Sequence, residues 1–163
     1  MERIVCILIG YVFGLFQTSF FYGKMKGIDI REHGSGNAGT TNTIRVLGTK
    51  AGLLVLAGDI LKCILAILLC GALFDASHPQ EVYLLKLYAA AGAILGHNFP
   101  FYLHFKGGKG IAATAGLILA FHPYFIPVGV ILFFGAFLTT HYVSLGSLLV
   151  YAGLMIQMVV CGQ

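Results

Sequence analysis

The chain has 163 residues, of which 58% are hydrophobic and 10% are charged, and its mean hydropathy is +0.90. Because an average soluble domain is about one-quarter charged, this composition excludes an ordinary soluble protein and indicates several membrane spans. The net charge of +4 comes from short basic connections that lack a soluble scaffold. Nucleic acid is therefore not an expected partner, whereas membrane lipids are.

The first hundred residues contain three long apolar segments. These segments are 4–22, 51–74 and 82–99. The first is long enough to cross a hydrocarbon core of about 30 Å at 1.5 Å per residue. A polar, glycine-rich and basic connection covers 23–50, and "DASHPQE" (75–81) is typical of a turn between two helices.

The rest of the chain is less regular. "PFYLHFKGGKG" (100–110) is a second basic connection, followed by apolar segments at 111–121, 124–140 and 145–161. The first of these is only half a membrane long before His122 and Pro123, which predicts a short or re-entrant helix. "HYVS" (141–144) predicts a tight turn. With six apolar segments, we expect an all-α, polytopic integral membrane helical bundle, forming one transmembrane domain over 1–163.

The positive-inside rule gives these segments an orientation. Basic connections in the cytoplasm place the amino terminus outside, and place 23–50, 100–110 and the turn at 141–144 on the cytoplasmic face. The four cysteines lie inside apolar segments without metal-ligand spacing. We expect them to be small apolar side chains rather than a disulfide or zinc framework: Cys6, Cys63, Cys70 and Cys161.

"HGSGNAGTTNTIR" (33–45) contains the spacing G-x-G-x-x-G of a dinucleotide-binding loop. That interpretation fails because the fingerprint belongs in a soluble βαβ unit, whereas this loop follows a membrane span. Glycines that bring backbone N–H groups close to an anion, next to basic side chains, instead favour phosphate. The second connection has the same character, with paired glycines between two lysines just before an expected helix start at Ile111. A flexible turn with two positive-inside lysines is the alternative there.

Polar side chains gather in the first loop. Arg45 is suited to bind two phosphate oxygens, and Ser35 lies between glycines, where it can approach a reacting carbonyl. The neighbouring hydroxyls and amides are Asn37, Thr40, Thr41 and Asn42. Taken alone, the loop fits equally well with these residues capping a surface helix and forming Asx turns.

Three further polar residues lie at or inside the expected spans. His97, beside Asn98 at the end of the third span, is more often a hydrogen-bonded structural residue than a base in this setting. Asp59 and Lys62 are one helical turn apart, and pairing would reduce the cost of placing their charges in the bilayer. We expect these two to serve helix packing or the wall of a site. Gly92 and Gly96 have the spacing of small-residue helix packing.

Three stretches resemble one family, the bacterial acyl-phosphate:glycerol-3-phosphate acyltransferases of the PlsY type. They are "GSGNAGTTNTIRVLGTKAG" (34–52), "GHNFPFYLHFKGGKGIAAT" (96–114) and "YVSLGS" (142–147). The resemblance implies a seven-helix enzyme of the bacterial inner membrane with a cytoplasmic active site. It would transfer a fatty acyl group from acyl phosphate to the 1-hydroxyl of glycerol 3-phosphate, giving lysophosphatidic acid and phosphate. An acyl-phosphate-producing enzyme becomes a candidate partner, and no metal or organic cofactor is implied.

The resemblance also implies roles for residues. Ser35 and Arg45 would be catalytic. The substrate-binding residues would be Gly36, Asn37, Thr41, Asn42, His97, Asn98, Lys106, Gly107, Gly108, Lys109, Gly110 and Ser144. None of the six histidines has Asp five residues later, as the H-x-x-x-x-D pair of thioester-dependent glycerolipid acyltransferases requires. That absence favours an acyl-phosphate donor.

The residues alone fit a small polytopic anion or lipid transporter, with the loops as phosphate-binding ends of broken helices, as well as they fit an enzyme. The resemblance favours the enzyme. Members of the family continue into a further helix and a motif of the form H-R-x-N-I, whereas this sequence stops at Gln163. We therefore expect a truncated chain with weak or no activity.

Overall fold

A computed structural model describes residues 1–160, apart from the side chain of Met158. The described part is helical and contains no strand, which confirms the predicted all-α class. It divides into two compact units, Met1–Leu117 and the residues from Ile118 onward. The helices of the first unit are α1 (Glu2–Leu15), α2 (Thr18–Met25), α3 (Thr40–Leu47), α4 (Thr49–Phe74) and α5 (Val82–Asn98), with the larger part of α6 (Ile111–Phe121).

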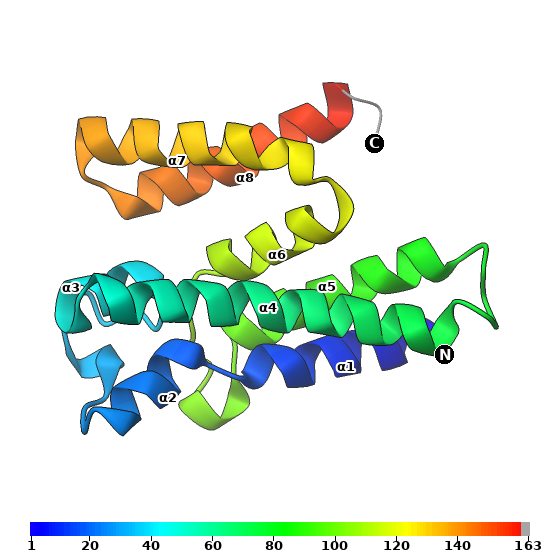
Figure 1. Cartoon of the computed structure of the whole chain (residues 1–163), viewed down its shortest axis with the longest axis horizontal. Coiled ribbons are helices and arrows are strands. Elements are labelled where there is room, and N and C mark those ends of the chain that lie inside the picture. Colours follow the sequence, from blue (N-terminus) through cyan, green and yellow to red (C-terminus); the bar gives the residue numbers. More distant parts are fainter. Residues whose placement is uncertain (161–163) are drawn as a thin grey trace. The chain divides into compact units, whose positions relative to one another are not determined.

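The second unit contains α7 (Ile126–Thr140) and α8 (Val143–Val160), which pack side by side (Figure 1). Short 3-10 turns occur at Ile30–Glu32, Phe101–Leu103 and Pro123–Phe125. The predicted turn at 141–144 is too long, because α8 already begins at Val143 and places Ser144 in its first turn. Cys161 lies outside the described residues, and the other three cysteines are buried and free, as expected.

The first apolar segment forms two helices rather than one. Phe16 and Gln17 have extended backbone, and the chain restarts as α2 at Thr18. The combined stretch Glu2–Met25 still has the length and hydropathy of a span, as do Thr49–Phe74 and Pro123–Thr140. The short helix predicted over 111–121 is confirmed at its expected bounds.

Small residues bring α1 and α5 together in the first unit. A Cβ on Gly10 would contact the Ala89 carbonyl, and one on Gly96 would contact the Tyr11 carbonyl, so the two backbones touch directly. This close approach confirms the small-residue packing predicted for α5. The two helices run beside one another in Figure 1.

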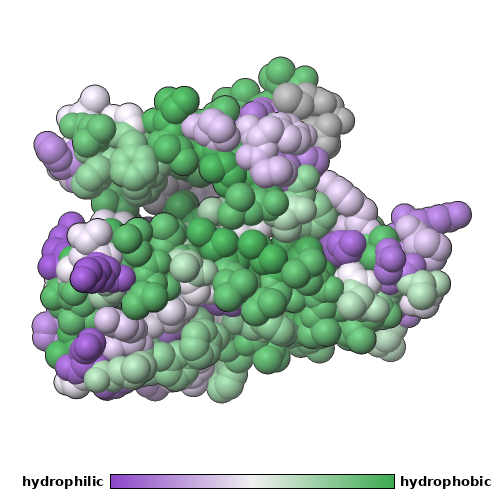
Figure 2. All heavy atoms as spheres, in the orientation of Figure 1, coloured by the Kyte–Doolittle hydropathy of each residue, from purple (hydrophilic) through white to green (hydrophobic). Residues whose placement is uncertain are grey.

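The surface of the first unit matches a membrane environment. Figure 2 shows it hydrophobic along its middle, with hydrophilic side chains gathered at its two ends. Leucines of α4 make part of this apolar band and face outward: Leu53, Leu54, Leu61, Leu65 and Leu68. A contiguous apolar surface of this kind is stable against lipid and costly in water.

Candidate active site

The first loop is held in place by one buried amide. The Asn42 side chain, 1% exposed on α3, accepts a hydrogen bond from the Ser35 backbone N–H at 2.8 Å. Its Nδ2 donates to the carbonyls of Ile30 (3.0 Å) and His33 (2.9 Å). A Cβ on Gly34, whose φ is +60°, would collide with the Asn42 Oδ1. Asn42, predicted to bind substrate, therefore lies beneath the loop with its side-chain polar atoms engaged.

The other predicted residues of this loop remain closer to the surface. Ser35, Gly36 and Arg45 are exposed, whereas Asn37 and Thr41 are half-buried. Among the described residues, no hydrogen bond or ion pair involves the Ser35 hydroxyl or the Arg45 guanidinium. Both groups are accordingly available to a ligand.

The second loop lies directly on the end of α5. The backbone N–H of Gly107 donates to the Asn98 carbonyl and that of Gly108 to the His97 carbonyl, each at 3.1 Å. A Cβ on Gly107 would collide with the His97 carbonyl, and a Cβ on Gly108 would collide with the His97 imidazole Nε2. These two glycines are required because His97 occupies the space that a side chain would need.

The loop then leads into α6 as predicted. Gly110 has a φ of +79° and lies against the Asn98 amide, whose buried Oδ1 has no hydrogen-bond partner among the described residues. Helix α6 starts at Ile111, so its amino-terminal N–H groups face the same region. The side chains of Lys106 and Lys109 are exposed beside it.

The two loops meet within the first unit. The Ala38 carbonyl of the first loop lies next to Gly108, and Arg31 donates to the Leu103 carbonyl at 3.2 Å. An open groove runs between them, lined by Asp29, Arg31, Glu32, Gly36, Leu103, His104 and Lys106. The positive-inside rule predicts both loops on one face, whereas the contact between them could not be predicted from the sequence. Ser144 belongs to the second unit, where it is exposed.

An ion pair fixes one wall of this groove. Arg31 bonds Asp29 through Nη2 at 2.8 Å and Nε at 3.1 Å. The hydrogen bonds from Arg31 hold the pKa of the Asp29 carboxyl below its usual range, and the same pair raises the pKa of Arg31. Arg31 therefore stays charged and anchored where the loops touch.

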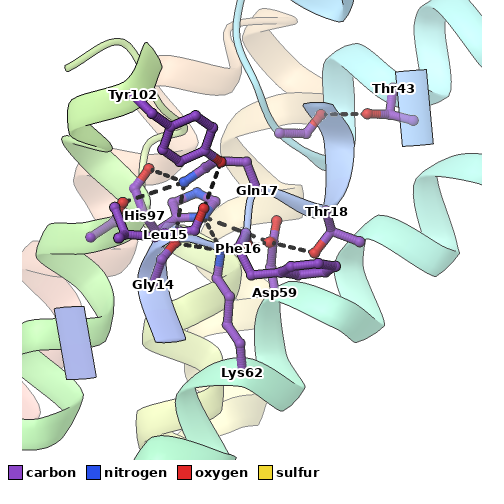
Figure 3. A network of polar contacts seen from close by, with 12 residues as sticks. Gly14, Leu15, Phe16, Gln17, Thr18, Thr43, Asp59, Lys62, His97 and Tyr102 are labelled. Carbon is purple, nitrogen blue, oxygen red and sulfur yellow. Dashed lines mark hydrogen bonds and ion pairs between the residues drawn. The ribbon is translucent and has the colours of Figure 1, made fainter. Parts of the chain in front are cut away.

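Beneath the second loop lies a buried polar network (Figure 3). The Lys62 ammonium is 2.9 Å from the Asp59 carboxylate, which confirms the predicted pair, and 2.7 Å from His97 Nδ1. Thr18 donates to the same carboxylate oxygen at 3.0 Å. The Asp59 and Lys62 side chains are 1% and 4% exposed, so the charges are compensated inside the protein rather than by water.

This network also satisfies the carbonyls that the break between α1 and α2 sets free. Lys62 Nζ donates to the Phe16 carbonyl at 2.8 Å, and the Tyr102 hydroxyl donates to the Leu15 carbonyl. Gln17 Nε2 donates to the His97 carbonyl at 2.8 Å. Unpaired carbonyls inside a membrane are costly, and these contacts remove that cost. Sequence analysis missed Gln17, although an amide within the first apolar segment was a usable signal.

Together the fold and the site define a polytopic helical membrane protein with two adjoining loops that are rich in glycine and carry exposed basic side chains. Within residues 1–160, no group of three His, Cys, Asp or Glu side chains is placed to hold a metal ion. Residues 4–162 match the family model described as "Glycerol-3-phosphate acyltransferase". The chain therefore belongs to the glycerol-3-phosphate acyltransferase family.

Named relatives and solved structures agree with this assignment. The chain is 44% identical to a glycerol-3-phosphate acyltransferase of Bacillus velezensis over 88% of its own length and 71% of the relative's. A protein of the same name from Macrococcus caseolyticus is 39% identical over 94% and 76%. The crystal structure of PlsY (YgiH) in its glycerol 3-phosphate form matches with TM-score 0.85 and 31% identity, covering 99% of this chain and 78% of that one. The lysophosphatidic acid form gives 0.83 and 30%.

Proposed function

We propose that this protein transfers a fatty acyl group from acyl phosphate to the 1-hydroxyl of glycerol 3-phosphate, forming lysophosphatidic acid and inorganic phosphate. It would act as one transmembrane domain in the bacterial inner membrane, with its site toward the cytoplasm. The observation that carries the proposal is the junction of two glycine-rich loops beside Lys106 and the start of α6. One relative, PlsY (YgiH), crystallised in a glycerol 3-phosphate form and a lysophosphatidic acid form, supports the acceptor and the product.

The reaction depends mainly on how the two substrates are positioned and on positive charge near the leaving phosphate. The acceptor hydroxyl oxygen attacks the acyl carbon, the bond from that carbon to the phosphate oxygen breaks, and phosphate leaves with the electron pair. The hydroxyl proton passes to a phosphate oxygen, for which a second pKa of about 6 is suitable. Backbone N–H groups of the loops and the cations Arg45 and Lys106 would stabilise the charge that develops on the leaving phosphate.

Within this scheme, Ser35 is a hydrogen-bond donor to the reacting carbonyl rather than a nucleophile. Among the described residues, no histidine or carboxylate is bonded to its hydroxyl as a general base would be. Asn42 is a positioning residue for the Ser35 backbone. Mass spectrometry of the protein quenched during turnover should find no acyl group on Ser35, and an acylated Ser35 would contradict this role.

Labelled substrates test the proposal. The full-length protein in nanodiscs receives radiolabelled glycerol 3-phosphate with either palmitoyl phosphate or palmitoyl-CoA. We expect labelled lysophosphatidic acid only with palmitoyl phosphate. Product formed from palmitoyl-CoA alone would overturn the donor assignment, and flux of glycerol 3-phosphate into proteoliposomes without acylation would favour a transporter.

Variants of Ser35 and Arg45, compared with matched control variants, test the role of the first loop in catalysis. Ser35→Ala and Arg45→Ala should each lower kcat/KM at least tenfold, the size expected when a hydrogen bond to a charged group is lost. Ser77→Ala and Arg3→Ala serve as controls, because these exposed residues lie near the 75–81 turn and outside both loops. Equal losses in the controls would contradict a specific role for Ser35 and Arg45.

A further inference from the structure

The surroundings of Lys62 decide where the proton of His97 lies. Three contacts of the Lys62 ammonium are to oxygens that can only accept: Asp59 Oδ1 at 2.9 Å, the Phe16 carbonyl at 2.8 Å and the Gly14 carbonyl at 3.3 Å. Lys62 is therefore the donor throughout this cluster. The shortest contact, to His97 Nδ1 at 2.7 Å, takes one of the three N–H groups of the ammonium, and the distant Gly14 carbonyl shares one of the others. Asp59 Oδ1 is 3.6 Å from the same Nδ1, which is too far for a hydrogen bond between them. An Nδ1 that accepts leaves the proton of the neutral ring on Nε2.

The Nε2 atom faces the place where the two loops join. A Cβ built on Gly108 would collide with it, and the same Cβ would lie 2.8 Å from the Ala38 carbonyl of the first loop. The residue is 2% exposed, and its ring is enclosed by Lys62 at Nδ1 and by the Gly108 backbone beside Nε2. Its carbonyl accepts from the Gly108 N–H and from Gln17, which holds the residue against the loop. The Nε2–H is thus directed from below at the loop junction.

We propose that Lys62 and Asp59 are positioning residues that hold His97 in the Nε2–H tautomer, so that this N–H donates to the phosphate group of glycerol 3-phosphate at the loop junction. The inference rests on the proposed function for the identity of the phosphate. It assigns Asp59 and Lys62 a role in substrate binding, in addition to stabilising the break between α1 and α2. Asp59 accepts from Lys62, Lys62 orients the imidazole, and His97 presents one fixed donor beside the N–H groups of the second loop.

The tautomer is measured directly in the wild-type protein. The full-length protein, labelled with ¹⁵N-histidine in nanodiscs, gives nitrogen shifts that distinguish Nε2–H from Nδ1–H, and His97→Gln assigns the resonance. We expect Nε2–H for His97, with a shift of that signal when glycerol 3-phosphate is added and none with glycerol. A Nδ1–H tautomer would overturn the inference. This readout needs no turnover, so it separates failure of the inference from failure of the proposed function.

The kinetics of two His97 variants, His97→Gln and His97→Asn, test whether Nε2–H is the donor to the phosphate group. The amide nitrogen of Gln reaches the position of imidazole Nε2, whereas that of Asn corresponds to Nδ1. His97→Gln should therefore keep KM for glycerol 3-phosphate within a few-fold of wild type, while His97→Asn should raise it roughly tenfold, as loss of one charge-assisted hydrogen bond does. Equal KM values for the two variants would overturn the inference.

Lys62→Met tests the orienting step, with Lys86→Met on α5 as a matched lysine that lies outside the network and contacts Gly71. We expect Lys62→Met to give a mixture of His97 tautomers and a raised KM for glycerol 3-phosphate, and Lys86→Met to change neither. A Lys62→Met protein that keeps a pure Nε2–H signal would overturn the orienting role. Thermal unfolding of both variants, scored separately, measures the contribution of Lys62 to the helix break.

Discussion

The two glycine-rich loops serve one region but are held in different ways. The first loop is fastened by Asn42, which lies seven residues after Ser35 on the next helix. The second loop is fastened from below by His97, which in turn depends on Lys62 from α4 and on Gln17 from the break after α1. The contacts that hold the first loop are local in sequence, whereas those that hold the second loop come from elements far apart in the sequence. A substitution that disturbs the second loop should therefore displace more of the structure than one that disturbs the first loop.

The largest expected effect comes from Gly108→Ala. Its Cβ would collide with His97 Nε2 and lie 2.8 Å from the Ala38 carbonyl, so both loops must shift. Because displacement of about 1 Å costs on the order of a hundredfold in rate, we expect a loss of that size in kcat/KM for glycerol 3-phosphate.

The matched control is Gly135→Ala on α7, where an added Cβ meets no atom within 4 Å. Alanine in an exposed helix should leave turnover unchanged and raise the unfolding temperature slightly. Wild-type kinetics for Gly108→Ala would show that the second loop does not need this close contact with His97.

A smaller loss of activity is expected from Asn42→Ala, which removes only the local hydrogen bonds that hold the first loop. It leaves the Ser35 N–H without its acceptor, while the carbonyls of Ile30 and His33 each keep one backbone N–H donor. Activity should fall roughly tenfold, because one lost hydrogen bond costs on the order of 1 kcal/mol and an unsatisfied group somewhat more.

Thr43→Val provides the comparison for Asn42→Ala. Thr43 is equally buried on α3 but bonds only the Gly39 carbonyl, so we expect a milder loss. Hydrogen exchange of the Ser35 amide should accelerate in Asn42→Ala and stay slow in Thr43→Val. Unchanged protection of the Ser35 amide in Asn42→Ala would contradict the role of Asn42 in holding the first loop.

The smallest effect concerns the ion pair of Asp29 and Arg31 in one wall of the groove. Because Arg31 lowers the pKa of Asp29 in the folded protein, the pair stabilises the fold above the ordinary Asp pKa and loses this contribution as pH falls through the lowered value. Thermal unfolding of wild type and Asp29→Asn should therefore differ by no more than about 1 kcal/mol near neutral pH. The difference should shrink below about pH 4. A difference that grows on acidification would contradict the assigned sign.

The sequence predicted the parts of this protein that depend on local pattern. Apolar length placed α4, α5 and α6, and glycines between lysines marked the second loop. The break after Leu15 escaped prediction because an apolar run does not show where its helix stops, and the freed carbonyls are satisfied by Tyr102 and Lys62 from distant segments. The hydrogen bonds from Asn42 to the first loop also escaped prediction, because its type and position say nothing about which way its amide points. Pairing of Asp59 with Lys62 was predictable, whereas their contact with His97 was not.

The central claim is that the two loops form one site, and a double-mutant cycle tests it most directly. Ser35→Ala and Lys106→Ala are made singly and together, and kcat/KM for glycerol 3-phosphate is measured for each in single turnover. Residues that share a substrate couple by about 0.5–3 kcal/mol, whereas independent sites add within roughly 0.3–0.5 kcal/mol. We predict that the double variant loses clearly less than the product of the two single losses. Losses that simply multiply would contradict a shared site.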